Sequence, residues 1–306
     1  MTPEIGAAVS ALRRGGLVAF PTETVYGLGA DATNASAVRR VFQVKGRPES
    51  HPLIVHLAAA DELSDWVRHV PEPARLLAAA CWPGPMTLLL ERAASVLPEI
   101  TGGLATVGIR VPAHPMAQEL LRAFGNGIAA PSANRFGHVS PTTAEHVRGD
   151  LGGDVDVILD GGPSAVGIES TIVDCTTDPP QVLRPGAITA ADISTILDGG
   201  PAAASGPSRA PGMLESHYAP RCRVVLGESR DVAVALAADA AAQGLRTELL
   251  DPAAPIAEYA RNLYAWLREA DARGVDVLVA VLPPATGIGV AVRDRLIKAA
   301  APRPDG

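Results

Sequence analysis

The chain has 306 residues, of which 47% are hydrophobic, 19% charged and 4% aromatic, and its formal net charge is −7. This composition is typical of a long soluble globular protein. Residues 1–200 hold 14 basic and 21 acidic side chains, residues 201–306 hold 12 of each, and only 11 residues are aromatic, so the chain lacks the basic, aromatic-rich surface of a general nucleic-acid binder.

The first 198 residues alternate apolar runs with helical patterns and Gly/Pro turns, which predicts an α/β fold. Because several strands follow one another without a helix between them, we expect a mixed sheet. Strands are expected at 17–21, 52–57, 86–90, 106–111, 127–130, 155–159, 170–174 and 181–183. Helices are expected near 3–14, 35–44, 61–68, 72–80, 115–124, 142–150 and 189–197.

Residues 199–220 are rich in Gly, Pro, Ser and Ala and are predicted to form a linker. Beyond it, a βαβαβα pattern predicts a small Rossmann-like domain over residues 221–306. Its Gly287-Ile288-Gly289 sequence lacks the rest of a phosphate-binding fingerprint, so we interpret it as a tight turn. The strands are expected at 223–226, 246–250 and 275–282, and the helices at 230–243, 254–272 and 288–300.

The run F-P-T-E-T-V-Y-G-L-G at residues 20–29 leaves an apolar strand and enters a polar, Gly-containing turn. Strand ends that feed such turns commonly build sites in α/β proteins. The alternative is an ordinary turn in which Thr22 and Thr24 cap backbone groups.

Only two of the 26 basic residues are lysines, Lys45 and Lys298. The helix that begins after Asn34 ends in K-G-R-P, where Gly46 suits the left-handed C′ position and the following proline forces Arg47 out of the helix. Two cations beside the polar turn favour an anion clamp, since arginine and lysine are not interchangeable at such sites. The alternative is a lysine that complements the helix dipole.

Two strands carry basic side chains at their ends. In the strand 106–111, Thr106, Gly108 and Arg110 share one face, which predicts the floor of a cleft for an anion or carboxylate; the alternative is an exposed sheet face. His56 ends an apolar strand, and a lone histidine there is more often a hydrogen-bonded core residue.

Further polar residues follow the later strands. In P-S-A-N, an extended chain directs Ser132 and Asn134 the same way. Ser140 or Thr142 is expected to cap the next helix, and helix N-termini are ready anion sites. The alternative is that Ser140 only caps the helix. Arg184 lies at another strand end.

The chain has no Walker motif, G-x-S-x-G elbow or H-E-x-x-H. An anion site without a dedicated nucleophile favours attack on a nucleotide phosphate, promoted by positioning and charge stabilisation.

Together these motifs resemble the YrdC-like L-threonylcarbamoyladenylate synthases. A-P-G-M and H-Y-A-P in the linker, with the α/β tail, resemble the long two-domain form of that family. The resemblance implies a YrdC-like twisted mixed sheet over residues 1–198, a linker and lid at 199–220 and a small Rossmann-like domain at 221–306. The motifs are F-P-T-E-T-V-Y-G-L-G, K-G-R-P, P-L-I-V-H, P-S-A-N, S-P-T, E-S-T-I-V-D and L-R-P-G.

The resemblance also implies a nucleotidyltransferase that makes L-threonylcarbamoyl-AMP and pyrophosphate from L-threonine, bicarbonate and ATP, with Mg²⁺. This is the first step of threonylcarbamoyl-adenosine formation in tRNA; a separate transferase would pass the group to the tRNA, and little or no direct tRNA binding is expected.

Matched position by position, the resemblance implies three groups of site residues. The residues that hold the phosphates and the carbamoyl-adenylate are Lys45, Arg47, Ser132 and Asn134. Those expected to contact L-threonine are Thr24, His56, Arg110, Ala130 through its backbone, and Ser170. Those expected to contact ATP are Arg47, His51, Thr106, Ser132, Ser140, Arg184 and Tyr218. His51 stands where the family has Asn, which makes its nucleotide contact sensitive to pH.

Several classes of protein are disfavoured. No window approaches 18 uninterrupted apolar residues and Glu4 lies where a signal peptide needs basic charge, so we expect a cytoplasmic protein without a membrane partner. Cys81, Cys175 and Cys222 form no C-x-x-C pair, which disfavours a zinc site or a disulfide framework. The alternatives are an RNA-binding module and a carbamoyl-transfer protein of hydrogenase maturation, although this chain lacks the Cys-rich zinc segments of the latter.

Overall fold

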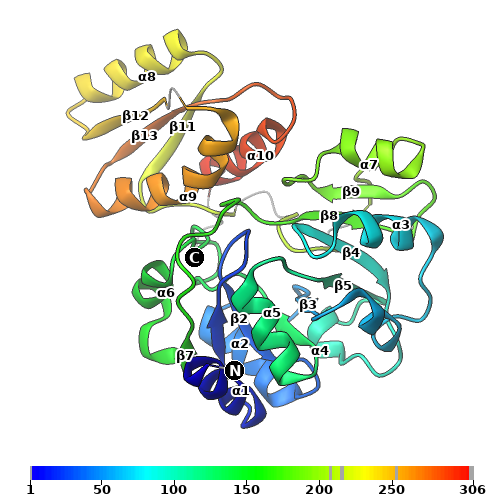
Figure 1. Cartoon of the computed structure of the whole chain (residues 1–306). Coiled ribbons are helices and arrows are strands. Elements are labelled where there is room, and N and C mark those ends of the chain that lie inside the picture. The colour runs from blue at the N-terminus through cyan, green and yellow to red at the C-terminus, as the bar shows by residue number, and fades with distance from the viewer. Residues whose placement is uncertain (1, 207–208, 214–216, 252–253, 303–306) are drawn as a thin grey trace.

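Two sheets organise the computed structural model, which describes residues 2–206, 209–213, 217–251 and 254–302. Figure 1 shows the larger sheet and its helices in one domain, with the smaller sheet in a second domain over one end of the first. The larger sheet consists of β1 (Val18–Phe20), β2 (Gly27–Asp31), β3 (Ile54–His56), β4 (Met86–Glu91), β5 (Thr106–Arg110), β6 (Ile128–Ala130), β7 (Val157–Ile158), β8 (Thr171–Asp174), β9 (Gln181–Arg184) and β10 (Ala202–Ala203). Its helices are α1 (Pro3–Arg13), α2 (Ala35–Lys45), α3 (Glu72–Cys81), α4 (Pro98–Thr101), α5 (Pro115–Phe124), α6 (Ala144–Leu151) and α7 (Ala190–Leu197).

The strands of the larger sheet run in the order β10-β9-β8-β4-β5-β3-β6-β2-β1-β7. Neighbours β3 and β5, β4 and β8, β1 and β7, and β9 and β10 are parallel, and the remaining pairs are antiparallel. The predicted mixed sheet is confirmed.

The two faces of this sheet are covered differently. Helices α2, α3, α4, α6 and α7 pack on one face, against Val55 and Ile109 among others. On the opposite face, α1 and α5 cover one end around Phe20, while Ala210 of the linker packs with Ile54 at the other end. Between these coverings, His56, Arg110 and Ala130 of the strands line a pocket.

The sequence prediction was wrong in several places in the larger sheet and its helices. The short helix α4 was not predicted, and β10 lies within the predicted linker, where it pairs with β9. Residues 20–29 do not form one turn, because β2 pairs antiparallel with β1 after a loop at 21–26. The signal of β2 was hidden by its glycines, which are needed because a Cβ at Gly29 would lie 2.6 Å from Ile128 and 2.9 Å from the Phe20 ring. Residues 61–68 were expected to be helical, but only a short 3₁₀ helix forms, Ala60–Asp65.

The ends of the helices are set by local chemistry. The Asn34 side chain caps α2 by accepting from the amides of Ser36 and Ala37, and Gly46 ends α2 with a φ of 63°, as predicted. Helix α6 is capped by Thr143 rather than by Ser140 or Thr142, which leaves Ser140 available for a different contact.

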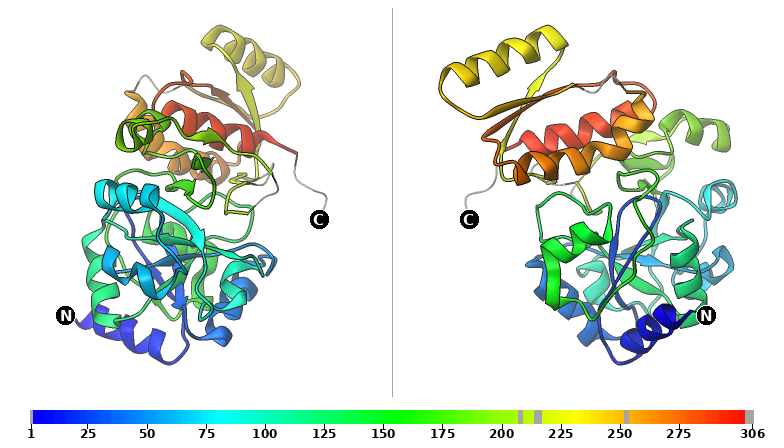
Figure 2. Two further views of the ribbon diagram at one scale, coloured as in Figure 1. Left: turned by 90° about the vertical axis from the view of Figure 1, so that its right-hand side faces the viewer. Right: turned by 60° about the vertical axis from the view of Figure 1, so that its left-hand side comes forward.

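The smaller domain contains β11 (Arg223–Gly227), α8 (Arg230–Ala242), β12 (Thr247–Leu250), α9 (Ile256–Ala272), β13 (Val277–Val281) and α10 (Gly289–Ala300). Its three strands are parallel in the order β11-β13-β12, with α8 on one face and α9 and α10 on the other (Figure 2). The predicted tight turn is confirmed, because Gly287 has a φ of 54° and a Cβ at Gly289 would lie 2.1 Å from the Pro284 carbonyl oxygen.

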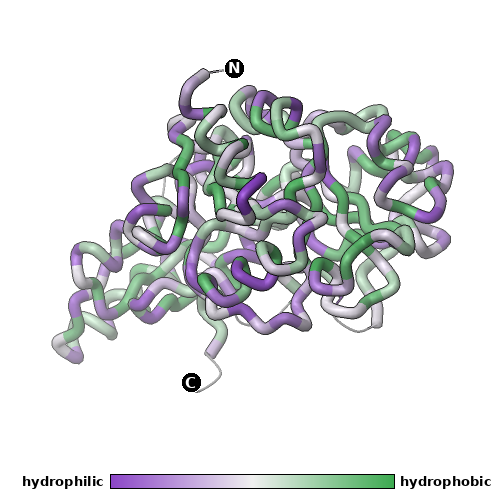
Figure 3. Tube along the Cα trace, turned by 90° about the horizontal axis from the view of Figure 1, so that it is seen from below, coloured by the Kyte–Doolittle hydropathy of each residue, from purple (hydrophilic) through white to green (hydrophobic). Residues whose placement is uncertain are grey.

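The helices of both domains alternate between polar and apolar residues along the chain (Figure 3), as expected of elements with one buried face. Helices α9 and α10 share a hydrophobic cluster with Val25, Val139 and Ile168 of the larger domain, so the two domains have a common apolar interface. No helix within the described residues is long and apolar enough to cross a membrane.

Candidate active site

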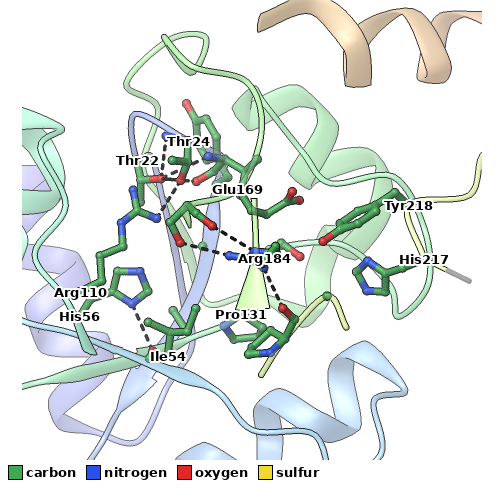
Figure 4. A pocket seen from close by; sticks show the side chains of 18 of the residues that line it. Thr22, Thr24, Ile54, His56, Arg110, Pro131, Glu169, Arg184, His217 and Tyr218 are labelled. Carbon is green, nitrogen blue, oxygen red and sulfur yellow. Dashed lines mark hydrogen bonds between the residues drawn. The ribbon is translucent and has the colours of Figure 1, made fainter. Parts of the chain in front are cut away.

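A pocket of about 580 Å³ opens on the incompletely covered face of the larger sheet. In Figure 4, Arg110 and His56 lie on one side of it, Tyr218 and His217 on the other, and Arg184 between them. The lining residues are Thr22, Thr24, Val25, Tyr26, Gly27, Arg47, Ile54, His56, Arg110, Ala130, Pro131, Ser132, Glu169, Ser170, Arg184, Pro211, Gly212, His217 and Tyr218.

The pocket brings together most of the residues predicted from the sequence. Those that line it are Thr24, Arg47, His56, Arg110, Ala130, Ser132, Ser170, Arg184 and Tyr218. Those outside its wall are Lys45, His51, Thr106, Asn134 and Ser140.

Strand register explains one side of the pocket. His56 is directly opposite Arg110 of β5, and Ile54 is opposite Ala130 of β6. Arg110 therefore lies on the floor of a cleft, as its alternation with the apolar residues of β5 predicted. Thr106, at the beginning of the same strand, is opposite Glu91 and does not reach the pocket wall.

Arg110 is held by the loop at 21–26. Its Nη2 donates to Glu23 Oε1 at 2.7 Å and its Nη1 donates to Thr24 Oγ1 at 2.8 Å. The other Glu23 oxygen accepts from the amide of Ala113 at 3.0 Å. The polar run in the sequence is thus an ordered loop that orients a buried cation, and a charge-assisted network of this kind can receive a carboxylate.

His56 was interpreted from the sequence both as a hydrogen-bonded core residue and, through the family resemblance, as a contact of L-threonine. The structure shows a buried, hydrogen-bonded side chain that also lines the pocket. Its Nδ1 lies 3.2 Å from the Ile54 carbonyl oxygen, and its ring packs edge-on against Phe20. Burial and the nearby Arg110 lower its pKa to about 3. The imidazole is therefore a neutral, hydrogen-bonded part of the pocket wall.

Arg184 joins the sheet to the linker. Its Nε donates to the Ser170 carbonyl at 3.0 Å, its Nη2 to Ser170 Oγ at 3.1 Å and its Nη1 to the Pro211 carbonyl at 3.2 Å. Ser170 Oγ is also 2.8 Å from Thr87 Oγ1. The side chain of Arg184 is thereby fixed at the centre of the pocket.

Arg47 supplies a third guanidinium. It donates to the His51 and Pro52 carbonyls at 3.3 and 3.1 Å, and it lies over the Phe136 ring. Burial lowers its pKa to about 10, so it still carries its charge at neutral pH. The pocket is therefore lined by three arginines, Arg47, Arg110 and Arg184, which makes it suited to anions.

Lys45 acts from behind the pocket. Its buried ammonium donates to the Ser132 carbonyl at 2.6 Å and to the Asn134 carbonyl. Burial lowers the pKa of Lys45 well below its usual value. Asn134 donates to the carbonyls of Arg135 and His138, at 2.7 and 2.9 Å. In this structure both predicted residues hold the loop that presents Ser132, and neither contacts the cavity.

Ser140 and His51 border the pocket indirectly. Ser140 Oγ donates to Glu169 Oε1 at 2.6 Å. His51 lines an adjoining cavity of about 690 Å³ that shares Arg47 and His217 with the first. A ligand longer than one cavity could therefore occupy both.

The linker forms the wall opposite Arg110. Tyr218 is buried and has a φ of 62°, a backbone conformation that non-glycine residues rarely adopt. A Cβ at Gly212 would lie 2.6 Å from Tyr218 Oη, so only glycine allows this packing. Lys298, the second lysine, donates to the Gly212 carbonyl at 2.6 Å. Each lysine of the chain thus holds a backbone carbonyl of a loop beside the pocket.

Replacing Lys298 by methionine is expected to increase amide hydrogen exchange in residues 209–213 about tenfold, because a charge-assisted hydrogen bond contributes ~1.5–3 kcal/mol and this one is partly screened by solvent. Arg293→Met is the matched control, because Arg293 is on the same helix and donates to the Pro283 carbonyl, away from the linker. Equal exchange in both variants would contradict the assignment.

The buried histidines predict how stability depends on pH. Burial lowers the pKa of His56 and of His217 to about 3, well below the usual 6.5. The unfolded chain therefore binds more protons below pH 6.5, and the folded state loses up to about 1.4 kcal/mol per pH unit for each histidine as the pH falls from about 6.5 towards 3. Urea unfolding at several pH values should show this loss, and His56→Gln should reduce its slope. A free energy of unfolding that stayed constant from about pH 6.5 to 4 would contradict the prediction.

The sequence prediction did not single out Thr22, Glu23, Glu169 or His217 as site residues. Each of them belongs to one of the motifs F-P-T-E-T-V-Y-G-L-G, E-S-T-I-V-D and H-Y-A-P. Their position next to Thr24, Ser170 or Tyr218 was the sequence signal that could have identified them. Among the described residues, no three histidine, cysteine or acidic side chains lie close enough to hold a metal ion.

The chain is similar to proteins of known activity over almost its whole length. A family model described as "Telomere recombination" matches residues 10–186, and one described as "Threonylcarbamoyl-AMP synthase, C-terminal domain" matches residues 188–301. The threonylcarbamoyl-AMP synthases of Pyrococcus abyssi and Bacillus subtilis are both 41% identical, over 97% and 98% of this chain and 94% of each relative. The crystal structure of P. abyssi Sua5 complexed with L-threonine superimposes with a TM-score of 0.93 and 40% identity, over 97% of this chain and 94% of that one.

Proposed function

The chain belongs to the threonylcarbamoyl-AMP synthase family, in its two-domain form, and from this membership we propose how its pocket carries out the reaction. The protein is an enzyme of the nucleotidyltransferase type that joins L-threonine, bicarbonate and ATP into L-threonylcarbamoyl-AMP and releases pyrophosphate. The observation that carries the proposal is a buried anion pocket lined by three arginines, with Arg110 on one side, Arg184 at its centre and Arg47 shared with the adjoining cavity.

We assign L-threonine to the Arg110 side. The guanidinium of Arg110 would pair with the threonine carboxylate, since it is already oriented by Glu23 and Thr24. His56, the backbone at Ala130 and Ser170 would complete the subsite, as the family resemblance implies. Because the His56 imidazole is neutral, it would contribute hydrogen bonding and shape rather than charge.

ATP is assigned to the Arg47 and Arg184 side. Ser132 and Tyr218 line this part of the same pocket, and His51 lines the adjoining cavity. Thr106 and Ser140 lie outside both cavity walls. Their contact with the nucleotide, which the resemblance implies, would require a local movement of the chain.

The reaction needs no covalent intermediate on the protein. The threonine amine adds to bicarbonate to give a carbamate with loss of water, and a carbamate oxygen then attacks the α-phosphorus of ATP as the bond to pyrophosphate breaks. Arg47 and Arg184 offset the negative charge that develops on the phosphates. Lys45 and Asn134 act on this step by fixing the loop that presents Ser132.

The described side chains do not form a resident magnesium site. Glu169, the carboxylate that lines the pocket, already accepts from Ser140, Tyr264 and Arg295, and the nearby Glu23 is paired with Arg110. No cluster of metal ligands occurs among the described residues. We therefore propose that Mg²⁺ arrives with ATP as the metal–nucleotide substrate.

The product is an activated acyl-adenylate, so we propose that a separate transferase consumes it and passes the threonylcarbamoyl group to tRNA. The enzyme itself would bind tRNA weakly or not at all, because residues 1–200 carry an acidic excess. A cytoplasmic location is proposed because the reaction draws on ATP and serves tRNA. No observation favours the RNA-binding or hydrogenase-maturation alternatives.

Release of pyrophosphate tests the assignment. We expect release to require ATP, L-threonine and bicarbonate together, and omission of either L-threonine or bicarbonate should abolish it. Release from ATP alone at the full rate would mean that the pocket hydrolyses nucleotide, and would contradict the proposal.

We also propose that the linker closes over the nucleotide as a lid. Of the predicted linker, residues 199–220, positions 207–208 and 214–216 lie outside the described residues. Pro211, Gly212 and Tyr218 already line the pocket. ATP with L-threonine should therefore protect the linker from limited proteolysis, whereas cleavage at the same rate with and without substrates would contradict a closing lid.

A further inference from the structure

Arg295 of α10 is the largest side chain among the fully buried described residues, although it belongs to the smaller domain. Its Nε donates to Glu169 Oε2 at 2.9 Å and its Nη1 donates to Asp294 Oδ2 at 2.7 Å. Its guanidinium carbon lies 5.3 Å from the centre of the Tyr218 ring. Arg295 therefore contacts two lining residues of the pocket, Glu169 and Tyr218, without itself entering the cavity.

Glu169 lines the pocket and accepts hydrogen bonds from both domains. One carboxylate oxygen accepts from Ser140 of the larger domain at 2.6 Å. The other accepts from Tyr264 of α9 at 2.8 Å and from Arg295 at 2.9 Å. Tyr264 also stacks on Tyr218, with ring centres 5.7 Å apart. The position of Glu169 and that of the Tyr218 ring are thus set by the same two side chains of the smaller domain.

We propose that Arg295 is a positioning residue for the synthesis reaction: it holds Glu169 and Tyr218 in the geometry that accepts ATP, and so makes the pocket dependent on the smaller domain. This inference rests on the proposed function, in which Tyr218 lies on the nucleotide side of the pocket.

The interface contains other contacts that join the domains without touching the pocket. Arg268 of α9 forms a two-point ion pair with Asp150, at 2.9 and 2.6 Å, and Arg261 donates to the Ala165 carbonyl at 2.9 Å. None of these residues lines the cavity. General docking of the domains can therefore be separated by mutation from the contact made by Arg295.

The charge of Arg295 matters because Glu169 is buried. The charged and titratable groups that face this carboxylate are Arg295 of α10, Tyr264 of α9, Arg184 of β9, and His217 and Tyr218 of the linker. Asp294 of α10 pairs with Arg295 on its other side. Arg295 and Arg184 outweigh the effect of burial and hold the pKa of Glu169 at about 2. Without Arg295 a buried carboxylate loses its ion-pair partner, which raises its pKa towards the working range of the enzyme.

The test compares Arg295→Gln with Arg268→Gln, a matched change at the same interface. We expect Arg295→Gln to reduce kcat/KM for ATP at least 30-fold and to move the acid limb of its pH profile to higher pH. Arg268→Gln should lower the melting temperature but change kcat/KM less than about threefold, with an unchanged pH profile. Equal effects of the two variants on kcat/KM and on the pH profile would overturn the proposal.

A second variant covers the case in which Arg295→Gln does not fold. Arg295→Lys keeps the charge but loses the planar fork, so it should keep the acid limb of the wild-type enzyme with a lower kcat/KM. An acid limb shifted to higher pH than that of the wild-type enzyme, or a wild-type kcat/KM, would overturn the role assigned to the guanidinium.

Calorimetric titration with ATP separates this inference from the proposed function. Binding of ATP by Arg295→Lys should be weakened about tenfold relative to the wild type, and binding by Arg268→Gln should be unchanged. If the wild-type protein formed no product, the proposed function would fail while this comparison would still decide whether Arg295 shapes the nucleotide site. Unchanged ATP affinity in Arg295→Lys would count against the inference alone.

Discussion

Replacing Arg110 by glutamine is expected to raise the KM for L-threonine about 100-fold, because a hydrogen bond to a charged group contributes ~1.5–3 kcal/mol and Arg110 is buried. The KM for ATP should stay within about twofold, since Arg47 and Arg184, rather than Arg110, are assigned to the nucleotide. Steady-state pyrophosphate release with each substrate varied in turn measures both constants.

The same substitution should also destabilise the fold. Arg110 and Glu23 form a buried ion pair, with side-chain exposures of 5% and 11%. Removing one partner of such a pair costs about 3–5 kcal/mol because the other charge is left buried. Glu23→Gln is the control, because it also breaks the pair but keeps the cation that faces the substrate. A threonine KM raised equally in both variants would show that orientation of the loop, rather than the charge of Arg110, controls binding.

Replacing Lys45 by methionine is expected to lower the rate of threonylcarbamoyl-AMP synthesis about 100-fold or more, through loss of the geometry of Ser132. Methionine fills much of the same volume but leaves two buried carbonyls without their donor, at a cost of ~1–3 kcal/mol each. The melting temperature should therefore fall together with the activity. Both are measured on purified protein, by product formation and by thermal unfolding.

Lys298→Met is the matched control for Lys45→Met, since it makes the same chemical change at the only other lysine of the chain. Lys298 donates to one backbone carbonyl of the linker, whereas Lys45 donates to two backbone carbonyls of the loop that contains Ser132 and Asn134. We expect a much smaller loss of activity for Lys298→Met. An equal loss of activity in the two variants would contradict the claim that Lys45 supports the reaction by fixing the loop that presents Ser132.

Local signals in the sequence predicted most of the elements. The Asn34 cap, the Gly46 stop of α2 and the βαβαβα order of the smaller domain depend on neighbouring residues, and each is present in the structure. Strand β2 was missed because its glycines are explained only by the Phe20 ring and Ile128 that pack against them. Such a reason is invisible until distant segments are brought together.

The site shows the same division. Arg110 was found from the alternation of its strand, and Arg184 because it ends a strand within L-R-P-G. Lys45 was expected at the anion itself, yet it bonds to backbone carbonyls 87 and 89 residues away in sequence. The partnership of Glu169 with Arg295, 126 residues further along the chain, depends on how the domains pack, and no local pattern contains that information.

The most direct test of the central claim is mass spectrometry of a reaction containing the purified protein, ATP, L-threonine and ¹³C-labelled bicarbonate. The account predicts a threonylcarbamoyl-AMP product that carries the label, formed together with an equal amount of pyrophosphate. AMP or ADP without any labelled adduct would contradict it.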